Sequence, residues 1–266
     1  MKHNLQVVGI LLMLFFFTQI IGLMAVEMYG LDNTLPLNIE RPEMQEQTSS
    51  ISLFVFILIA TVLALLLIKF KMFKFWRMWF LLSVFFTLTV TLNAFVAEYI
   101  AVILAIIFAI WKIFKPNVYV HNLTELFIYG ALAVIFVPLL SIWGVILLLV
   151  LISVYDYIAV RKTKHMIKLA KSQSESKVFA GLVVPYGKNV AILGGGDIGF
   201  PLLFAAVVMV QFGLTAFDWR SYIIPLFTVL MLFVLFMKGE KKKYYPAMPY
   251  VTLGCILGLE VLLLFL

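Results

Sequence analysis

Two aspartates at the ends of strongly apolar stretches are the residues of this chain best suited to chemistry. Asp156 lies near the end of one apolar stretch, and Asp197 follows three consecutive glycines, Gly194 to Gly196, at the start of the next one. A carboxylate at membrane depth costs on the order of a few kcal/mol, so such a residue usually marks function. Two carboxylates close together cannot both ionise, and the pair can therefore act as acid and base on a water molecule.

The composition indicates which elements position these aspartates. Of the 266 residues, 64% are hydrophobic and 12% are charged, whereas a soluble domain is about 25% charged and about 45–50% apolar. The apolar runs are continuous and about 20 residues long, as in membrane helices, whereas barrel strands would alternate. The sequence therefore excludes an ordinary soluble domain. It predicts an all-α polytopic membrane protein, located in the cell membrane as a multi-pass protein.

We predict nine transmembrane helices within a single membrane domain that covers residues 1–266. The first apolar run is too long for a signal peptide, and no small-residue cleavage site follows it, so we interpret it as a membrane helix. Residues 161–195 form a cytoplasmic loop between the two spans that carry the aspartates. The predicted spans are residues 7–27, 51–69, 76–95, 97–114, 122–138, 141–160, 196–213, 221–238 and 246–265.

The loop charges set the orientation of these spans. With a cytoplasmic N-terminus, all of the 20 lysines and arginines fall on the cytoplasmic side except Arg41 and Arg220. This is the bias that the positive-inside rule describes, so we expect a cytoplasmic N-terminus and an extracytoplasmic C-terminus. Topology and contact with anionic lipid headgroups account for the net charge of +7, and nucleic-acid binding is not expected.

No metal or cofactor is expected. Cys255 is the single cysteine, which excludes an intrachain disulfide and a multi-cysteine metal site. His3, His121 and His165 are scattered in basic segments, where we expect solvated side chains and no zinc cluster. The lipid bilayer itself is the expected surrounding partner.

A third irregular segment should lie beside the two aspartates. Asp156 is followed by the end of its span at Arg161, so it lies roughly 7–8 Å inside the cytoplasmic helix end at ~1.5 Å per residue. Asp197 starts the next span, so both carboxylates are expected in the same leaflet. The segment Tyr245-Pro246-Ala247-Met248-Pro249-Tyr250 opens the ninth span from that side. Its prolines remove backbone donors, and we expect the loosened backbone to pack against Asp197.

The loop between the aspartates contains two segments typical of strands. Residues 178–184 and 189–193 are apolar and rich in β-branched residues, and Pro185-Tyr186-Gly187 indicates a turn between them. The pair is either an interfacial hairpin that packs against the helices or a strand edge offered to an extended peptide.

These motifs resemble those of the presenilin and signal-peptide-peptidase family of intramembrane aspartyl proteases, most closely its archaeal members. Tyr155-Asp156 is similar to the family's YD motif, Gly194-Gly195-Gly196-Asp197 to GxGD, and Pro246-Ala247-Met248 to PAL. The resemblance covers essentially the whole chain in span count, orientation and motif order. Met248 stands where the family has leucine, and Gly195 occupies the position that influences substrate choice in the family.

The resemblance implies a presenilin-like fold and an intramembrane-cleaving aspartic endopeptidase. Such an enzyme hydrolyses peptide bonds within transmembrane helices of membrane-protein substrates. Asp156 and Asp197 would activate water without a covalent intermediate, a metal or a cofactor. Tyr155, the glycines Gly194, Gly195 and Gly196, and the residues Pro246, Ala247 and Met248 would position the site and the substrate.

Two other functions stay open at the level of the residues. A prepilin- or preflagellin-type membrane aspartyl peptidase also has membrane aspartates and a GxGD motif, but it has fewer spans and no PAL element. A cation transporter or channel could use broken helices and membrane aspartates, although no internal repeat relates the halves of this chain. The sequence indicates neither a particular substrate nor an oligomeric state.

Overall fold

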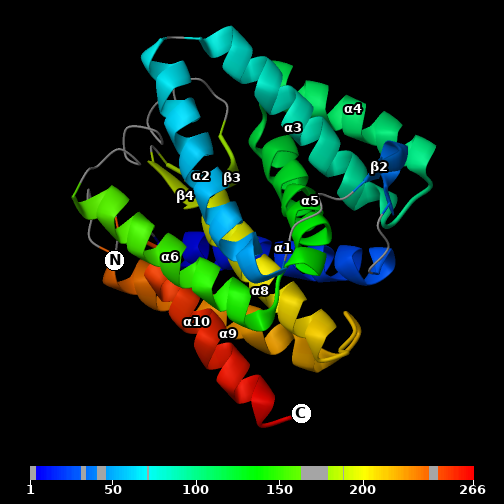
Figure 1. Cartoon of the computed structure of the whole chain (residues 1–266). Helices are drawn as coiled ribbons and strands as arrows, with labels where there is room; N and C mark the ends of the chain where they lie inside the picture. Colours follow the sequence, from blue (N-terminus) through cyan, green and yellow to red (C-terminus); the bar gives the residue numbers. More distant parts are fainter. Residues whose placement is uncertain are drawn as a thin grey trace.

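The computed structural model describes residues 4–30, 34–40, 46–70, 72–162, 179–187, 189–239 and 245–266. Within these ranges the protein is mostly helical, with two small antiparallel sheets (Figure 1). The nine long α-helices of these ranges lie over the nine predicted spans. They are α1 (Leu5–Tyr29), α2 (Glu46–Lys69), α3 (Phe73–Asn93), α4 (Glu98–Phe114), α5 (Val118–Phe136), α6 (Ile142–Arg161), α8 (Gly195–Gln211), α9 (Ile223–Lys238) and α10 (Met248–Leu263).

Six helical segments of the described residues are long and apolar enough to cross a membrane. They are Leu5–Tyr29, Ser50–Leu67, Lys74–Asn93, Val118–Leu139, Ile142–Arg161 and Trp219–Lys238. The other three helices, α4, α8 and α10, have 17, 17 and 16 residues. At ~1.5 Å per residue such a helix is about 25 Å long, slightly less than the hydrocarbon core. Two of them, α8 and α10, start beside the predicted site aspartates, inside the bundle.

Helix α8 lies in the interior of the bundle, behind α2 and α6 in the view of Figure 1. It contacts α1, α5, α6, α9 and α10, and each of its residues from Pro201 to Met209 is buried. A helix that is apolar all round is expected at the centre of a bundle. On α1, Gly22 leaves room for the side chain of Leu202, which a Cβ at position 22 would strike. The aspartate at the start of α8 is therefore attached to a helix whose middle is buried throughout.

Helices α3 and α4 form a pair beside α5. On α4, Ala101, Ala105 and Ala109 recur every fourth residue and are 0–1% exposed. Small residues at this spacing allow two membrane helices to approach closely. Val84 and Leu88 of α3 pack with Ala105 and Ala109 in a separate small core.

Helices α9 and α10 pack closely through two glycines of α10. A Cβ added at Gly254 would lie 2.8 Å from the Cα of Thr228, and one at Gly258 would lie 2.7 Å from the Cα of Ile224. Both distances are too short for real atoms, and the obstructing atoms belong to backbone that cannot turn aside. The pattern Gly-x-x-x-Gly thus fixes α10 against α9.

The described parts of the connections outside the site contain short strands, 3-10 turns and polar contacts. Between α1 and α2 lie β1 (Thr34–Leu35), the 3-10 turn Pro36–Asn38 and β2 (Ile39–Glu40). In this turn the backbone N–H of Leu37 donates to Glu98 Oε1 at 2.8 Å. Near the predicted end of the fifth span at residue 138, α5 stops at Phe136 and the 3-10 turn Val137–Leu139 follows. Another 3-10 turn, Trp219–Tyr222, precedes α9.

The described part of the loop between α6 and α8 is a β-hairpin. Strands β3 (Gly181–Tyr186) and β4 (Asn189–Gly194) pair antiparallel along their whole length, and they pack against α1, α5 and α8. Residues 163–178, which form the first part of the predicted loop, lie outside the described residues.

The hairpin turn is tighter than we predicted. Pro185 and Tyr186 were expected in the turn, but both belong to β3, opposite Val190 and Asn189. A proline fits a strand position whose N–H does not point toward the partner strand. The chain then reverses at Gly187, whose φ of +54° is accessible mainly to glycine.

Candidate active site

The Asp156 carboxylate binds the start of α10. Its Oδ2 accepts a hydrogen bond from the backbone N–H of Met248 at 3.1 Å, and a second one comes from the backbone of Ala247. Met248 is the first residue of α10, and the N–H groups of a first helical turn have no partner within the helix. Asp156 therefore lies where the dipole of α10 favours a negative charge.

This contact differs from our expectation that the proline segment packs against Asp197. Pro249 is the second residue of α10, a position where a missing N–H leaves no bond unmade. Tyr250 and Val251 both donate to the carbonyl of Ala247, each at 3.0 Å. The backbone hydrogen bonds of the first turn of α10 therefore begin at the carbonyl of Ala247. The N–H of Met248 has no partner within the helix and donates to the Asp156 carboxylate of α6.

A hydroxyl pair one turn away supports the same contact between α6 and α10. Ser153 Oγ and Thr252 Oγ1 lie 2.7 Å apart, and Thr252 also donates to the carbonyl of Leu149 at 3.4 Å. Ser153 is three residues before Asp156, and Thr252 is four residues after Met248. Both pairs therefore lie on the same helix faces. Together these two contacts fix Asp156 relative to α10.

Asp197 lies in the first turn of α8 and bonds back to the residue before the helix. Gly194 is the N-cap, and its backbone makes a hydrogen bond to the Asp197 carboxylate. An acidic third residue that caps its own helix is a common arrangement. Asp156 and Asp197 are close enough to interact electrostatically. The structure thus brings the two sequence-predicted aspartates together, each at the N-terminus of a helix.

The three glycines before Asp197 do not form a loop. Strand β4 ends at Gly194 and α8 begins at Gly195. A Cβ at Gly194 would lie 3.2 Å from Asp197 Oδ2, and one at Gly195 would lie 2.8 Å from the Tyr129 hydroxyl oxygen. At Gly196 the nearest atom, from Phe200, would be 3.4 Å away, which is ordinary contact. Close approach therefore explains Gly194 and Gly195, while Gly196 has room for a side chain.

Tyr155 contacts α2, a helix that carries neither aspartate. Its ring packs edge-on against Phe54 of α2, with ring centroids 6.5 Å apart and planes at 83°. The tyrosine of the predicted YD motif thus joins α6 to α2.

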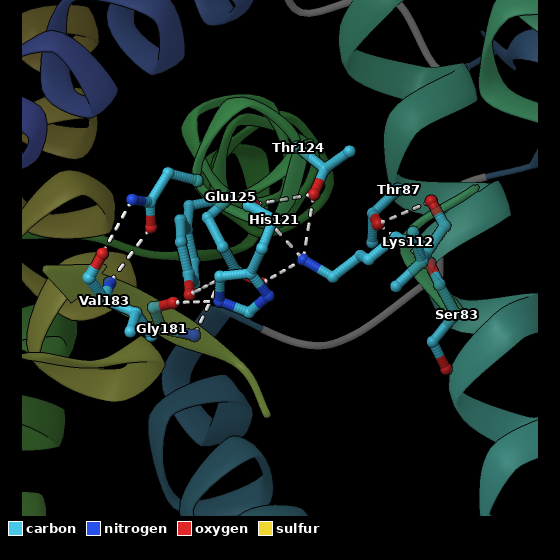
Figure 2. A network of polar contacts seen from close by, with 11 residues as sticks. Ser83, Thr87, Lys112, His121, Thr124, Glu125, Gly181 and Val183 are labelled. Atoms are coloured by element: carbon cyan, nitrogen blue, oxygen red, sulfur yellow. Dashed lines mark hydrogen bonds and ion pairs between the residues drawn. The ribbon is translucent and has the colours of Figure 1, made fainter. Parts of the chain in front are cut away.

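A buried polar network that we did not predict lies next to this site, and Figure 2 shows it in detail. Lys112 Nζ of α4 lies 2.6 Å from Glu125 Oε1 of α5 and 2.8 Å from Thr124 Oγ1. The other oxygen, Glu125 Oε2, accepts from the backbone N–H of Gly181 at 2.8 Å and from the Tyr129 hydroxyl. The side chains of Lys112 and Glu125 are 2% and 0% exposed.

Two expectations are corrected by this network. Lys112 was counted among the basic residues of a cytoplasmic loop, but its side chain is buried in an ion pair between helices. His121 was expected to be a solvated loop residue, but it lies in the first turn of α5. There a ring nitrogen bonds the carbonyl of Gly181 at 2.8 Å, and the ring stacks on Phe179. His3 and His165 lie outside the described residues. An acidic residue inside a predicted span was the available signal for Glu125.

The outer edge of β3 is occupied by side chains of α5. Asn122 donates to the carbonyl of Val183 at 2.7 Å and accepts from the N–H of Val183 at 3.0 Å. Together with the bonds to Gly181, this shows that Gly181 and Val183 point their backbone groups away from β4. In an antiparallel pair the residues opposite them must also point outward. Ile192 is opposite Val183, and Val190 and Ile192 have side chains 47% and 46% exposed. The available strand edge is therefore that of β4.

Across the described ranges, no group of three or more His, Cys, Asp or Glu side chains is placed so that it could hold a metal ion.

Comparison with known proteins shows the family and the fold of the chain. Residues 12–266 match the sequence model of a family described as signal-peptide peptidase, presenilin aspartyl protease. No curated protein gives a significant match to the chain. Among solved structures, a presenilin family intramembrane aspartate protease in a C222 crystal form is 21% identical, with a TM-score of 0.66 and 94% of each chain covered. A P2 crystal form of such a protease is 20% identical, with a TM-score of 0.69, covering 96% of this chain and 97% of that one.

Proposed function

Because the chain belongs to the signal-peptide peptidase, presenilin aspartyl protease family and is an intramembrane aspartyl protease, we propose that Asp156 and Asp197 are its catalytic residues. The main support for this proposal is that the two carboxylates lie close together at helix N-termini. Two carboxylates from helices adjacent in sequence interact with each other, and each is bonded to backbone at the N-terminus of a helix. The family assignment decides against the prepilin-type peptidase and against the transporter.

In the proposed mechanism the two carboxylates share one proton. Like charges at close range cannot both ionise, so one group stays protonated over a wide pH range. The ionised carboxylate takes a proton from a water molecule, and this water attacks the scissile carbonyl carbon. The protonated carboxyl polarises the carbonyl oxygen, and its proton then goes to the leaving amine nitrogen.

The proposed substrates are transmembrane helices of other membrane proteins. A helical peptide bond hides its carbonyl in the backbone ladder, so the substrate must be extended at the site before water can attack. The outward edge of β4 at Val190 and Ile192 offers backbone groups to such an extended segment. Since β4 runs directly into Gly195 and Asp197, a strand added there would lead toward the aspartates.

We place this protease in the cell membrane as a multi-pass protein, with nine spans, a cytoplasmic N-terminus and an extracytoplasmic C-terminus. Support comes from the distribution of loop charges, in which only Arg41 and Arg220 fall outside. Under this orientation the aspartates and the hairpin lie toward the cytoplasmic leaflet.

The test is cleavage of a transmembrane peptide by purified protein in detergent. Asp156→Asn and Asp197→Asn should each lower turnover by roughly 100-fold to 10,000-fold, the usual size of an acid or base contribution. Glu260→Gln is the matched control, because Glu260 is an exposed carboxylate on α10 and its loss should leave turnover unchanged. Substantial activity in either aspartate variant, with the fold intact, would show that the two-carboxylate mechanism is wrong.

A further inference from the structure

The ion pair of Lys112 and Glu125 has no part in the mechanism above, although it is costly to bury. Both side chains are removed from solvent, at 2% and 0% exposure. Burying two charges costs several kcal/mol per ion, so an ion pair of this kind adds little stability by itself. An ionisable residue within a membrane helix is a functional candidate unless another role explains it.

Glu125 holds two separate parts of the site with one carboxylate. Its Oε1 is taken by Lys112, while Oε2 accepts both the N–H of Gly181 and the hydroxyl of Tyr129. Gly181 is the first residue of β3, and Tyr129 is one turn along α5 on the same face. Glu125 thus links the hairpin to Tyr129. Lys112 balances the charge of the Glu125 carboxylate (Figure 2).

Tyr129 in turn packs against the glycines around Asp197. The tyrosine is 3% exposed, and a Cβ at Gly195 would lie 2.8 Å from its hydroxyl oxygen and 3.2 Å from its ring. Its ring also lies beside Gly199, where a Cβ would be 3.4 Å away. Tyr129 is close enough to Asp197 to interact with it electrostatically. The Tyr129 side chain therefore fills the space between α5 and the first turn of α8.

The junction between β4 and α8, which Tyr129 contacts, has little stiffness of its own. Strand β4 passes into α8 through Gly194, Gly195 and Gly196, and glycine restricts the backbone least of all residues. One backbone bond, from the N–H of Gly195 to the carbonyl of Ala180 at 3.2 Å, ties the junction to the hairpin. Without further support, the β4 edge could tilt relative to Asp197.

We propose that Glu125 and Tyr129 are positioning residues that fix the β4 edge relative to Asp197 and so determine which peptide bond of the substrate is cut. This inference rests on the proposed function, in which the substrate extends along β4 and Asp197 is catalytic. A strand advances about 3.3 Å per residue, so a tilt of a few ångströms at the junction presents a neighbouring peptide bond.

The experiment uses a synthetic peptide with one apolar segment of about 20 residues flanked by lysines, and the products are read by mass spectrometry. Tyr129→Phe keeps the ring and removes only the hydroxyl that Glu125 holds. We expect kcat to fall roughly 10-fold, since small misplacements are costly in rate, and we expect additional products cut at neighbouring bonds. Lys112→Met with Glu125→Leu leaves no unpaired charge and no acceptor for the Tyr129 hydroxyl, so this variant should give the same additional products.

Two further variants separate positioning from general loosening. Asn122→Ala removes bonds from α5 to Val183 of β3 but touches neither Tyr129 nor Gly195, so it should keep the parent's cut position. Gly195→Ala should lower kcat because its Cβ would meet the Tyr129 hydroxyl. In the parent, Tyr129→Phe should lower kcat. In a Gly195→Ala background the same substitution should raise kcat, because it removes the hydroxyl that the new Cβ meets.

The outcomes are distinct. A single cut position and parental kcat in Tyr129→Phe would overturn the inference, and so would an equal fall of kcat in Tyr129→Phe and Asn122→Ala without new products. Failure of the proposed function is recognised separately, because then the parent would not cut the peptide, or Asp197→Asn would cut it as well.

Discussion

At the scale of single residues, both aspartates are placed at the N-termini of helices. Asp156 accepts from the start of α10, and Asp197 bonds the N-cap of its own helix. The free N–H groups and the dipole of a helix start favour negative charge. The proposed catalytic pair, which shares one proton, carries one negative charge, and these helix ends would stabilise that charge.

The Pro-Ala-Met segment offers a residue-scale prediction. Pro246→Ala adds a backbone N–H and lets α10 begin earlier, which moves the Met248 N–H away from Asp156. A misplacement of ~1 Å can cost on the order of 100-fold in rate, so we expect a loss of that size in turnover with little change in thermal stability. Met248→Leu keeps the N–H and about the same volume, so its turnover should stay within about 3-fold of the parent. Equal turnover for Pro246→Ala and the parent would show that Pro246 only starts a helix.

At the scale of elements, the hairpin presents one edge because α5 occupies the other. Asn122, His121 and Glu125 bond the outward backbone groups of Gly181 and Val183 in β3. Such covering of an edge prevents uncontrolled strand pairing. The edge of β4 has exposed side chains at Val190 and Ile192. An extended segment added to the hairpin would therefore pair with β4 and not with β3.

A proline on β4 tests this asymmetry. Ile192→Pro removes an N–H that points away from β3, so the hairpin should survive while one backbone bond to the substrate is lost. A hydrogen bond contributes about 0.5–1.5 kcal/mol net, so KM should rise roughly 3-fold to 10-fold, with kcat changed less. Ile192→Ala is the control, since it removes the side chain and keeps the N–H. If both variants have the same KM, the substrate contacts side chains and not the strand edge.

The α9–α10 contact gives a second element-scale prediction. Gly258→Ala puts a Cβ 2.7 Å from the Cα of Ile224, and because the helices must separate to admit it, we expect a loss of about 1–3 kcal/mol in stability. Gly9→Ala is the matched substitution, since nothing lies within 4 Å of a Cβ at Gly9 on α1. Thermal unfolding in detergent should show the first variant less stable than the parent and the second at least as stable. A Gly258→Ala protein as stable as the parent would contradict the close packing.

At the scale of the whole molecule, the sequence predicts what short patterns encode. Apolar runs locate the nine helices, and the aspartates stand out because a carboxylate in such a run is expensive. The bond from Met248 to Asp156 could not be predicted, because it depends on how α6 and α10 pack. The Lys112–Glu125 pair was missed for a similar reason. Lys112 lies at a helix end, where lysine is usually solvated, and only the packing of α4 on α5 shows that it is buried.

Loop charges predict the orientation of the whole molecule in the membrane, and thiol labelling tests this prediction. Cys255 is buried and can be replaced to give a background without reactive thiols. Tyr119→Cys and Phe217→Cys then place single thiols at side chains that are 84% and 76% exposed, both outside the predicted spans. The nine-span arrangement puts position 119 inside and position 217 outside, because an odd number of spans lies between them.

A membrane-impermeant maleimide added to intact cells should therefore label position 217 at once and position 119 only after permeabilisation. Labelling of both from one side would break the alternation of the spans. It would also remove the argument that the aspartates, which start and end neighbouring spans, lie toward one leaflet.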